Sequence, residues 1–191
     1  MVKEWNFSII FFLISLLVFS QEKKTGVQEK GLSFKTQSLV LIRYNNTESK
    51  DIYQKDFELG ENTFLYGING EFNYYFNPHF AAGIGVGLEK ISKPSIVYTP
   101  LYVNIIGVFN KTQKSLYSKL NFGVHLGNID NTGFLFRFGL GAKVPFFKKI
   151  PLNIEFTYSF QNLNKTFVNS NRPDNFYNLE SIGLSIGIEI N

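Results

Sequence analysis

The dominant feature of this sequence is an alternation of apolar and polar residues with period two. In residues 64–76 the even positions include Phe64, Ile68 and Phe72, whereas the odd positions include Asn69 and Glu71. No stretch sustains the i, i+3, i+4, i+7 spacing of apolar residues that an amphipathic helix needs. Because successive side chains of a strand point to opposite faces, the pattern predicts an all-β protein.

The alternation predicts eight strands joined by connections of unequal length. Tight links after the second, fourth and sixth strands, at residues 77–78, 110–114 and 146–150, contrast with long polar links at residues 45–61 and 161–176. Short turns on one rim and longer loops on the other are typical of transmembrane barrels. We therefore expect an eight-stranded antiparallel up-and-down transmembrane β-barrel, with strands in residues 33–43, 64–76, 79–90, 97–109, 116–127, 134–144, 152–160 and 181–190.

The composition of the two strand faces separates this fold from a secreted, soluble, lipocalin-like barrel that binds a small apolar ligand. A soluble barrel would turn Gly83, Gly85 and Gly87 to water, where glycine weakens a strand. It would also have to pack most of the Phe, Leu and Ile side chains into a lumen that barely holds side chains. In a membrane barrel the bulky face meets lipid, and the small and polar face fills the lumen. The soluble barrel remains the alternative.

The amino-terminal residues have the three-part layout of a secretory signal. Lys3 precedes the apolar stretch 7–19, and Val18 and Ser20 occupy the −3 and −1 positions of a cleavage site before Gln21. A membrane-spanning helix needs roughly 17–25 apolar residues, which this stretch does not reach. We expect a signal peptide in residues 1–20, a flexible periplasmic linker in 21–31 and the barrel in 32–191.

With these features the chain resembles the small eight-stranded bacterial outer-membrane β-barrel superfamily, which includes the OmpA transmembrane domain and the OmpX-like and PorT-like barrels. The resemblance covers residues 32–191 and rests on the signal, the strand number, the loop asymmetry and the alternating last strand. It implies a monomer in the bacterial outer membrane, surrounded by its lipid and inserted by the barrel assembly machinery. The chain departs from many such barrels because it ends on Ile190-Asn191 rather than on an aromatic residue.

Charged residues on the small, polar face make the lumen the candidate site. Opposite signs at similar heights predict ion pairs that plug the lumen, because an unpaired charge there is costly. We therefore expect a non-enzymatic barrel with a closed lumen, with a role in envelope structure, surface interaction or accessory transport; a proton or ion path is the alternative. One cluster lies near the short-turn rim (Glu71, Lys119, Lys143 and Glu155) and one nearer the other end (Arg43, Glu89 and Arg137).

Catalytic, metal and nucleic-acid sites find little support. The chain has no cysteine and two distant histidines, His79 and His125, so neither a metal nor another cofactor is expected. The run 125–128 is similar to the His-x-Ser-Asn run of lipid A deacylases, but Gly127 replaces the nucleophilic serine and Leu140 the orienting glutamate. A lipid-modifying enzyme is thus the less favoured alternative. The net charge of +4 is dispersed, which argues against nucleic acid as a partner.

Two further surfaces are candidates for contacts with partners. The long polar loops 45–61 and 161–176 could carry recognition of a surface ligand. Lys111 and Lys114, on the opposite rim, could meet lipid phosphates. Aromatic residues flank the short turns, as an interfacial girdle would: Tyr74, Tyr75, Phe76, Phe80, Phe109, Tyr117, Phe146 and Phe147.

Overall fold

The computed structural model describes residues 30–48, 63–93, 95–109, 115–126, 133–147, 150–165 and 175–190. The expected signal peptide and most of the expected linker lie outside these ranges. All regular structure within them is β-strand. The strands are β1 (Gly31–Glu48), β2 (Phe64–Asn77), β3 (Phe80–Ile91), β4 (Ile96–Val108), β5 (Ser115–Leu126), β6 (Gly133–Phe147), β7 (Ile150–Lys165) and β8 (Asn175–Ile190).

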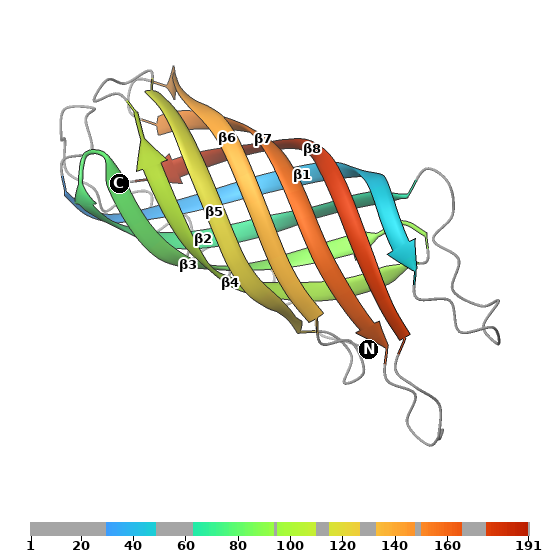
Figure 1. Ribbon diagram of the computed structural model, residues 1–191. Coiled ribbons are helices and arrows are strands. Elements are labelled where there is room, and N and C mark those ends of the chain that lie inside the picture. The colour runs from blue at the N-terminus through green and yellow to red at the C-terminus, as the bar shows by residue number, and fades with distance from the viewer. Residues whose placement is uncertain are drawn as a thin grey trace, which may run out of the picture.

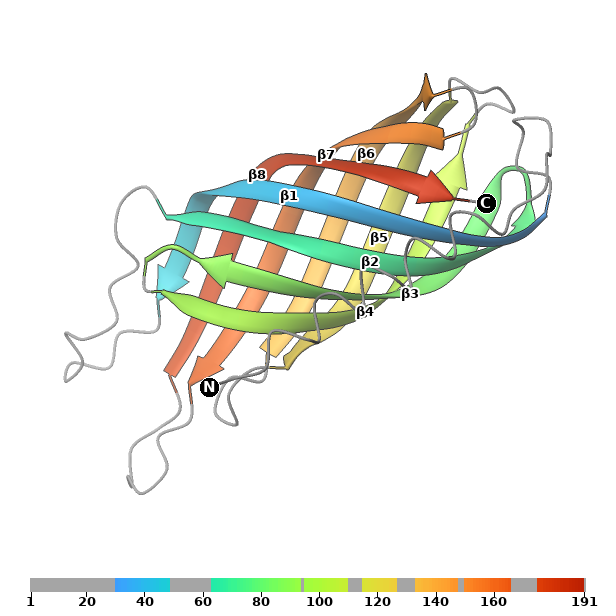
Figure 2. The ribbon, with the colours of Figure 1, turned by 180° about the vertical axis from the view of Figure 1, so that it is seen from behind.

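The strands form a closed antiparallel barrel in which each strand pairs with its neighbours in sequence, and β1 pairs with β8 (Figures 1 and 2). The closing pair runs from Phe34 opposite Ile190 to Glu48 opposite Tyr177, with a bulge between Arg43 and Asn45. The predicted eight-stranded up-and-down barrel is therefore confirmed. Closure also explains why the fold needs no protected sheet edge around its circumference.

The wall formed by β7, β8 and β1 is taller than the sequence predicted. The strand β1 continues to Glu48 and β7 to Lys165, so the long loops expected at 45–61 and 161–176 are shorter by these residues. Pairing beyond the predicted ends explains the difference, because Lys165 lies opposite Asn175. By contrast, the pairing of β1 with β2 ends at Ile42 opposite Phe64. The added segments of these strands are polar and rich in asparagine, so alternation does not predict them. They are identified as strand by their pairing with neighbouring strands.

The two strand faces separate as predicted, with bulky apolar side chains outside. In β2 the outward Ile68 and Phe72 are 62% and 56% exposed, whereas the inward Asn69 and Glu71 are 0% exposed. In β4 the odd-numbered positions face outward, opposite to β2 and β3, since Leu101 is exposed whereas Tyr102 and Asn104 are buried. The girdle prediction was wrong for two members, because Tyr75 and Tyr117 point into the lumen and are 1% and 2% exposed.

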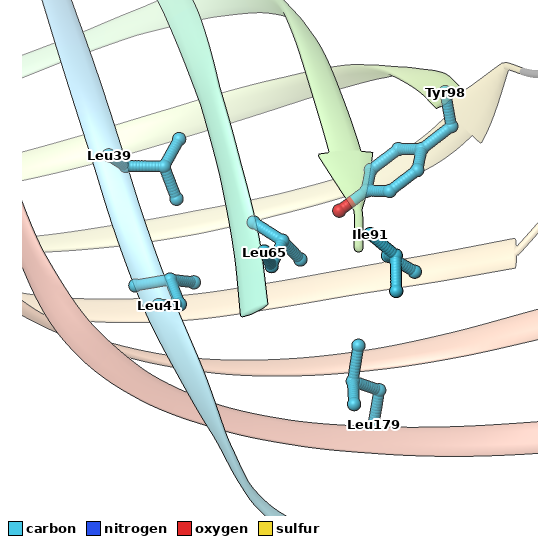
Figure 3. Packing of buried hydrophobic residues seen from close by; sticks show 6 residues of the cluster. All are labelled: Leu39, Leu41, Leu65, Ile91, Tyr98 and Leu179. Atoms are coloured by element: carbon cyan, nitrogen blue, oxygen red, sulfur yellow. The ribbon is translucent and has the colours of Figure 1, made fainter. Parts of the chain in front are cut away.

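Apolar side chains fill the lumen near both ends, which the expected polar lumen did not include. Near the long-loop end, side chains from five strands pack together, with Leu65 lying between Leu39 and Leu41 of β1 and Ile91 of β3 (Figure 3). Near the short-turn end a second cluster surrounds the two inward tyrosines. The first cluster comprises Leu39, Leu41, Leu65, Ile91, Tyr98 and Leu179, and the second Tyr75, Ala81, Ile106, Val108 and Tyr117.

Inward glycines give the long side chains between these clusters their space. A Cβ on Gly139 would lie 2.6 Å from the Oε1 atom of Glu155, and one on Gly141 would lie 2.6 Å from the Tyr117 hydroxyl. Both distances are too short for a real contact, so a side chain at either glycine would displace its neighbour. The small face of each strand therefore holds the charged and aromatic groups of the adjacent strand.

Candidate functional site in the barrel lumen

The middle of the lumen holds four basic and four acidic side chains in ion pairs. All are nearly inaccessible to solvent except Lys143, whose side chain is 12% exposed. Because the numbers of positive and negative charges are equal, this set is electrically neutral. The basic members are Lys35, Lys119, Arg137 and Lys143, and the acidic members are Glu71, Glu89, Glu155 and Glu189.

The largest network joins β1, β2, β5 and β7 through Lys119. The Lys119 Nζ atom lies 2.9 Å from Glu71 Oε1 and 3.2 Å from Glu155 Oε2. Lys35 Nζ also lies 3.4 Å from Glu155 Oε2, so this carboxylate has two basic partners. The amide of Gln37 completes the network, since its nitrogen donates to Glu71 and its oxygen accepts from Lys119. Four strands are thus tied together across the lumen.

A second pair joins β6 to β8 close to the short-turn end. Lys143 Nζ lies 2.7 Å from Glu189 Oε2, and it also donates to the Tyr75 hydroxyl at 2.7 Å. A third pair lies nearer the long-loop end, where the Arg137 guanidinium donates through two nitrogens to the two oxygens of Glu89, at 2.6 and 2.5 Å. Such bidentate pairs are among the stronger hydrogen-bonded ion pairs in proteins.

Each of the four carboxylates also accepts a hydrogen bond from a tyrosine hydroxyl. The donor–acceptor distances lie between 2.8 and 3.0 Å. A carboxylate in a dry interior needs more than one partner, because a single cation leaves its other lone pairs unsatisfied. Tyrosine supplies this second donor while its ring fills space. The pairs are Tyr102 with Glu71, Tyr98 with Glu89, Tyr117 with Glu155 and Tyr75 with Glu189.

The structure brings together most of the residues that the sequence singled out, in a partly different grouping. Glu71, Lys119 and Glu155 share one network, whereas Lys143 pairs with Glu189 instead. At the other end Glu89 pairs with Arg137. Arg43 is half-buried, and its backbone N–H donates to the Thr63 carbonyl oxygen at 3.0 Å.

Two members of the lumen set, Lys35 and Glu189, were missed. Glu189 lies on the inward face of the last strand in the predicted pattern, so its parity was a sufficient signal. Lys35 lies in the strand with the least clear alternation, because the inward positions of β1 change from polar Ser33, Lys35 and Gln37 to apolar Leu39 and Leu41. A strand whose inner face crosses from the ionic to the apolar part of the lumen cannot show simple alternation.

Solved structures resemble this barrel, although no protein-family model and no curated protein matches the sequence. The crystal structure of Neisserial surface protein A matches with a TM-score of 0.59 and 13% identity, covering 88% of this chain and 99% of that one. The crystal structure of the outer membrane protein OprG from Pseudomonas aeruginosa matches with a TM-score of 0.56 and 8% identity, over 88% and 100% of the two chains. The chain has the fold of the small eight-stranded outer-membrane β-barrels.

A third similar structure is that of the outer membrane protein AlkL in lipid bilayers, with a TM-score of 0.55, 15% identity, and coverage of 88% of this chain and 93% of that one. The outward face of the present chain suits such surroundings. Tyr66 and Tyr74 of β2 are eight residues apart, which corresponds to about 20 Å along the axis of a barrel with tilted strands. This height is close to the apolar band of about 25 Å in outer-membrane barrels.

Charged residues on the outward face lie away from the middle of the barrel. Among the strand side chains that the structure describes, Lys90 and Glu180 are the charged residues that face outward. Both lie towards the long-loop ends of their strands, β3 and β8. The side chains between them and the short turns are apolar or small, so no described charge faces outward in the middle of the barrel.

The histidine that prompted an enzymatic alternative lies inside the lumen. His125 is 0% exposed and its ring packs edge-on against Tyr98, with the ring centroids 4.5 Å apart. Leu140 faces outward and is 49% exposed, so it does not lie beside His125 in the lumen. Gly127 falls outside the described residues. The structure therefore does not bring the residues at positions 125 and 140 together.

Most residues of the remaining candidate sites lie outside the described ranges. In the described ranges no group of three His, Cys, Asp or Glu residues could hold a metal ion, and no helix is long and apolar enough to cross a membrane. Lys111 and Lys114 lie outside those ranges, as do residues 49–62 and 166–174 of the two long loops.

Proposed function

We propose that this protein is a non-enzymatic barrel of the bacterial outer membrane whose lumen is closed to ions. In this role it is a rigid, lipid-embedded support that serves envelope structure, surface interaction or accessory transport. Of these, surface interaction has the most specific support, because the β7–β8–β1 wall rises above the rest of the long-loop rim. Rigid scaffolds commonly present recognition segments in this way.

The observation that carries the proposal is the neutral, fully paired set of lumen charges between two apolar clusters. An ion that entered would have to displace a paired side chain and give up its own hydration, and both steps are costly in a low-dielectric interior. An eight-stranded barrel has an interior that side chains can fill completely. A filled lumen of this kind therefore supports a structural role for the barrel rather than a role as an ion-conducting pore.

Conductance of the purified protein in planar lipid bilayers tests closure. We expect negligible conductance from the wild-type protein, because the ion pairs and the apolar clusters block the path. The outward variant Ile84→Val serves as a control for insertion and purity. Steady openings of the wild type whose size changes in Glu71→Gln or Arg137→Ala, but not in Ile84→Val, would show a conducting lumen and overturn the proposal.

Membrane location is tested by fractionation of cells that express the full chain. We expect the protein in the outer-membrane fraction, extractable by detergent but not by carbonate, and shifted on gels by heating as closed barrels are. The exposed apolar outer face is the physical reason. Release into buffer or carbonate would instead favour the secreted soluble barrel, whose exterior would have to be polar.

A further inference from the structure

An outward carboxylate near the long-loop end of the barrel lacks a basic partner among the described residues. Glu180 of β8 is partly exposed and lies on the outer face of the wall, in line with Ile182 and Leu184. No ion pair of the described side chains includes it, whereas all four glutamates of the lumen set have a basic partner. The outer face of β8 therefore carries a negative charge that is open to a cation from outside the chain.

Aromatic residues flank this carboxylate on the strands at either side of β8. Phe160 of β7 lies directly opposite Glu180, and Tyr158, the next outward residue of β7, interacts with both Glu180 and Tyr44 of β1. Tyr44 is the extra residue of the bulge that interrupts the pairing of β1 with β8, and it is 71% exposed. Bulges commonly re-aim a side chain near functional sites. Here the bulge adds an exposed ring to the surroundings of Glu180.

The height of this group of residues corresponds to the border between the apolar band and the lipid headgroups. Glu180 is ten residues from Ile190, the short-turn end of β8, which corresponds to about 25 Å along the axis of a barrel with tilted strands. The apolar band of outer-membrane barrels is also about 25 Å tall. The other outward charge, Lys90, is ten residues from Phe80 at the short-turn end of β3. The two charges of opposite sign thus lie at the same height on different strands.

The combination of one carboxylate with several aromatic rings suits an organic ammonium group. The carboxylate oxygens accept N–H hydrogen bonds, and the faces of aromatic rings attract a positive charge. A magnesium or calcium ion would need about six oxygen ligands, whereas the described residues hold no group of three side chains that could bind a metal ion. The negative charge of Glu180 also disfavours a phosphate group that lacks an ammonium.

We propose that Glu180, Tyr44, Tyr158 and Phe160 bind the primary ammonium group of a lipid headgroup on the long-loop side of the membrane. The ammonium donates to the Glu180 carboxylate and lies against the rings, while the acyl chains of the lipid follow the apolar outer face below. A primary ammonium fits better than a quaternary one, because only the primary group has N–H donors. This inference goes beyond the function proposed above and rests on its membrane location.

Native mass spectrometry of the full chain in detergent tests the site with lipids of known headgroup. The protein is mixed with equal amounts of phosphatidylethanolamine, phosphatidylcholine and phosphatidylglycerol that share the same acyl chains, with EDTA present to remove divalent cations. We expect phosphatidylethanolamine to bind roughly tenfold more tightly than phosphatidylglycerol, the combined effect of an exposed ion pair and a cation–π contact. It should also bind more tightly than phosphatidylcholine. Equal binding of phosphatidylethanolamine and either other lipid would overturn the proposal.

Four variants show whether the preference arises at this site. Glu180→Gln removes the charge at nearly constant volume and should abolish the preference for phosphatidylethanolamine. Lys90→Gln, the matched control at the same height on β3, should keep it. Tyr44→Leu should weaken the preference, whereas Tyr44→Phe should not, because phenylalanine keeps the ring. A preference that survives Glu180→Gln, or one that Lys90→Gln removes equally, would overturn the proposal.

The same measurement separates failure of this site from failure of the membrane location. Lipids that bind to the wild-type protein without any preference would refute the ammonium site and leave the membrane location standing. Absence of bound lipid of every kind would count against both. The substituted side chains lie on the outer face of the wall, so the lumen packing that holds the barrel together is the same in all four variants.

Discussion

At the scale of single residues, the lumen shows how buried charge is made tolerable. Each carboxylate has at least one basic partner and a tyrosine hydroxyl, so removal of a sole basic partner leaves a buried charge that hydrogen bonds compensate only in part. Arg137 and Glu89 are the clearest case, because they form a bidentate pair away from the larger network. The pair's contribution is conditional, since its attraction mainly offsets the desolvation of its own two members.

This reasoning predicts opposite effects for breaking and for replacing the pair. Arg137→Met should lower the free energy of unfolding by about 3–5 kcal/mol, because Glu89 is left buried without its cation. Adding Glu89→Gln should recover most of that loss. Urea titration of the barrel in lipid or detergent measures both values. A double variant as unstable as Arg137→Met alone would mean that packing of the arginine, rather than charge, dominates.

At the scale of strands, glycines set how closely neighbouring strands and their side chains approach. Gly183 of β8 lies at the closing seam, where a Cβ would lie 2.7 Å from the Leu41 Cα atom of β1. Gly70 of β2 faces outward, and a Cβ there would meet only the Phe34 ring at 3.7 Å, an ordinary contact. The same residue type therefore has different roles on the two faces.

We accordingly expect Gly183→Ala to destabilise the barrel by about 1–3 kcal/mol, the usual cost of overpacking a filled interior. Gly70→Ala, the matched control, should be neutral or slightly stabilising, because alanine restricts the unfolded chain. The unfolding midpoint in urea distinguishes them. Equal effects of the two substitutions would argue that the seam adjusts without strain.

At the scale of the whole molecule, the barrel combines an apolar exterior with a neutral lumen, which is the arrangement that the proposed membrane location requires. The outward Ile84 lies near the middle of β3 and is 59% exposed, whereas Val97 is equally apolar and exposed but lies at the long-loop end of β4. In water such an exterior would promote aggregation, because exposed apolar patches of this extent mark interaction surfaces. In a bilayer it is the solvated face.

A charge scan of the exterior checks this placement. Ile84→Lys should lower the stability of the folded barrel in bilayers by about 2–4 kcal/mol, whereas Val97→Lys should cost about 0–1 kcal/mol. The physical reason is the depth of the new charge, since a lysine near the interface can reach water. Folding titrations into vesicles measure the difference. Equal costs at the two positions would show that the two side chains do not lie at different depths in lipid.

Much of this molecule could be predicted because period-two alternation is a local property. The outward side chains of β2 and the inward Glu71 follow from parity alone, and so does the glycine-rich inner face. The extension of β1 to Glu48 could not be predicted, because Asn45 and Asn46 carry no strand signal and pair with residues more than a hundred positions away. Likewise, the sequence predicted Tyr75 and Tyr117 as rim aromatics because they flank short turns, whereas in the structure both side chains point into the lumen.

The sequence by itself determined the fold class, the number of strands and which face of most strands turns outward, because each depends on spacing along one strand. Tertiary structure alone decided which charges pair. Those pairings depend on strand tilt and stagger, which bring Lys143 to Glu189 and Lys35 to Glu155 across the lumen.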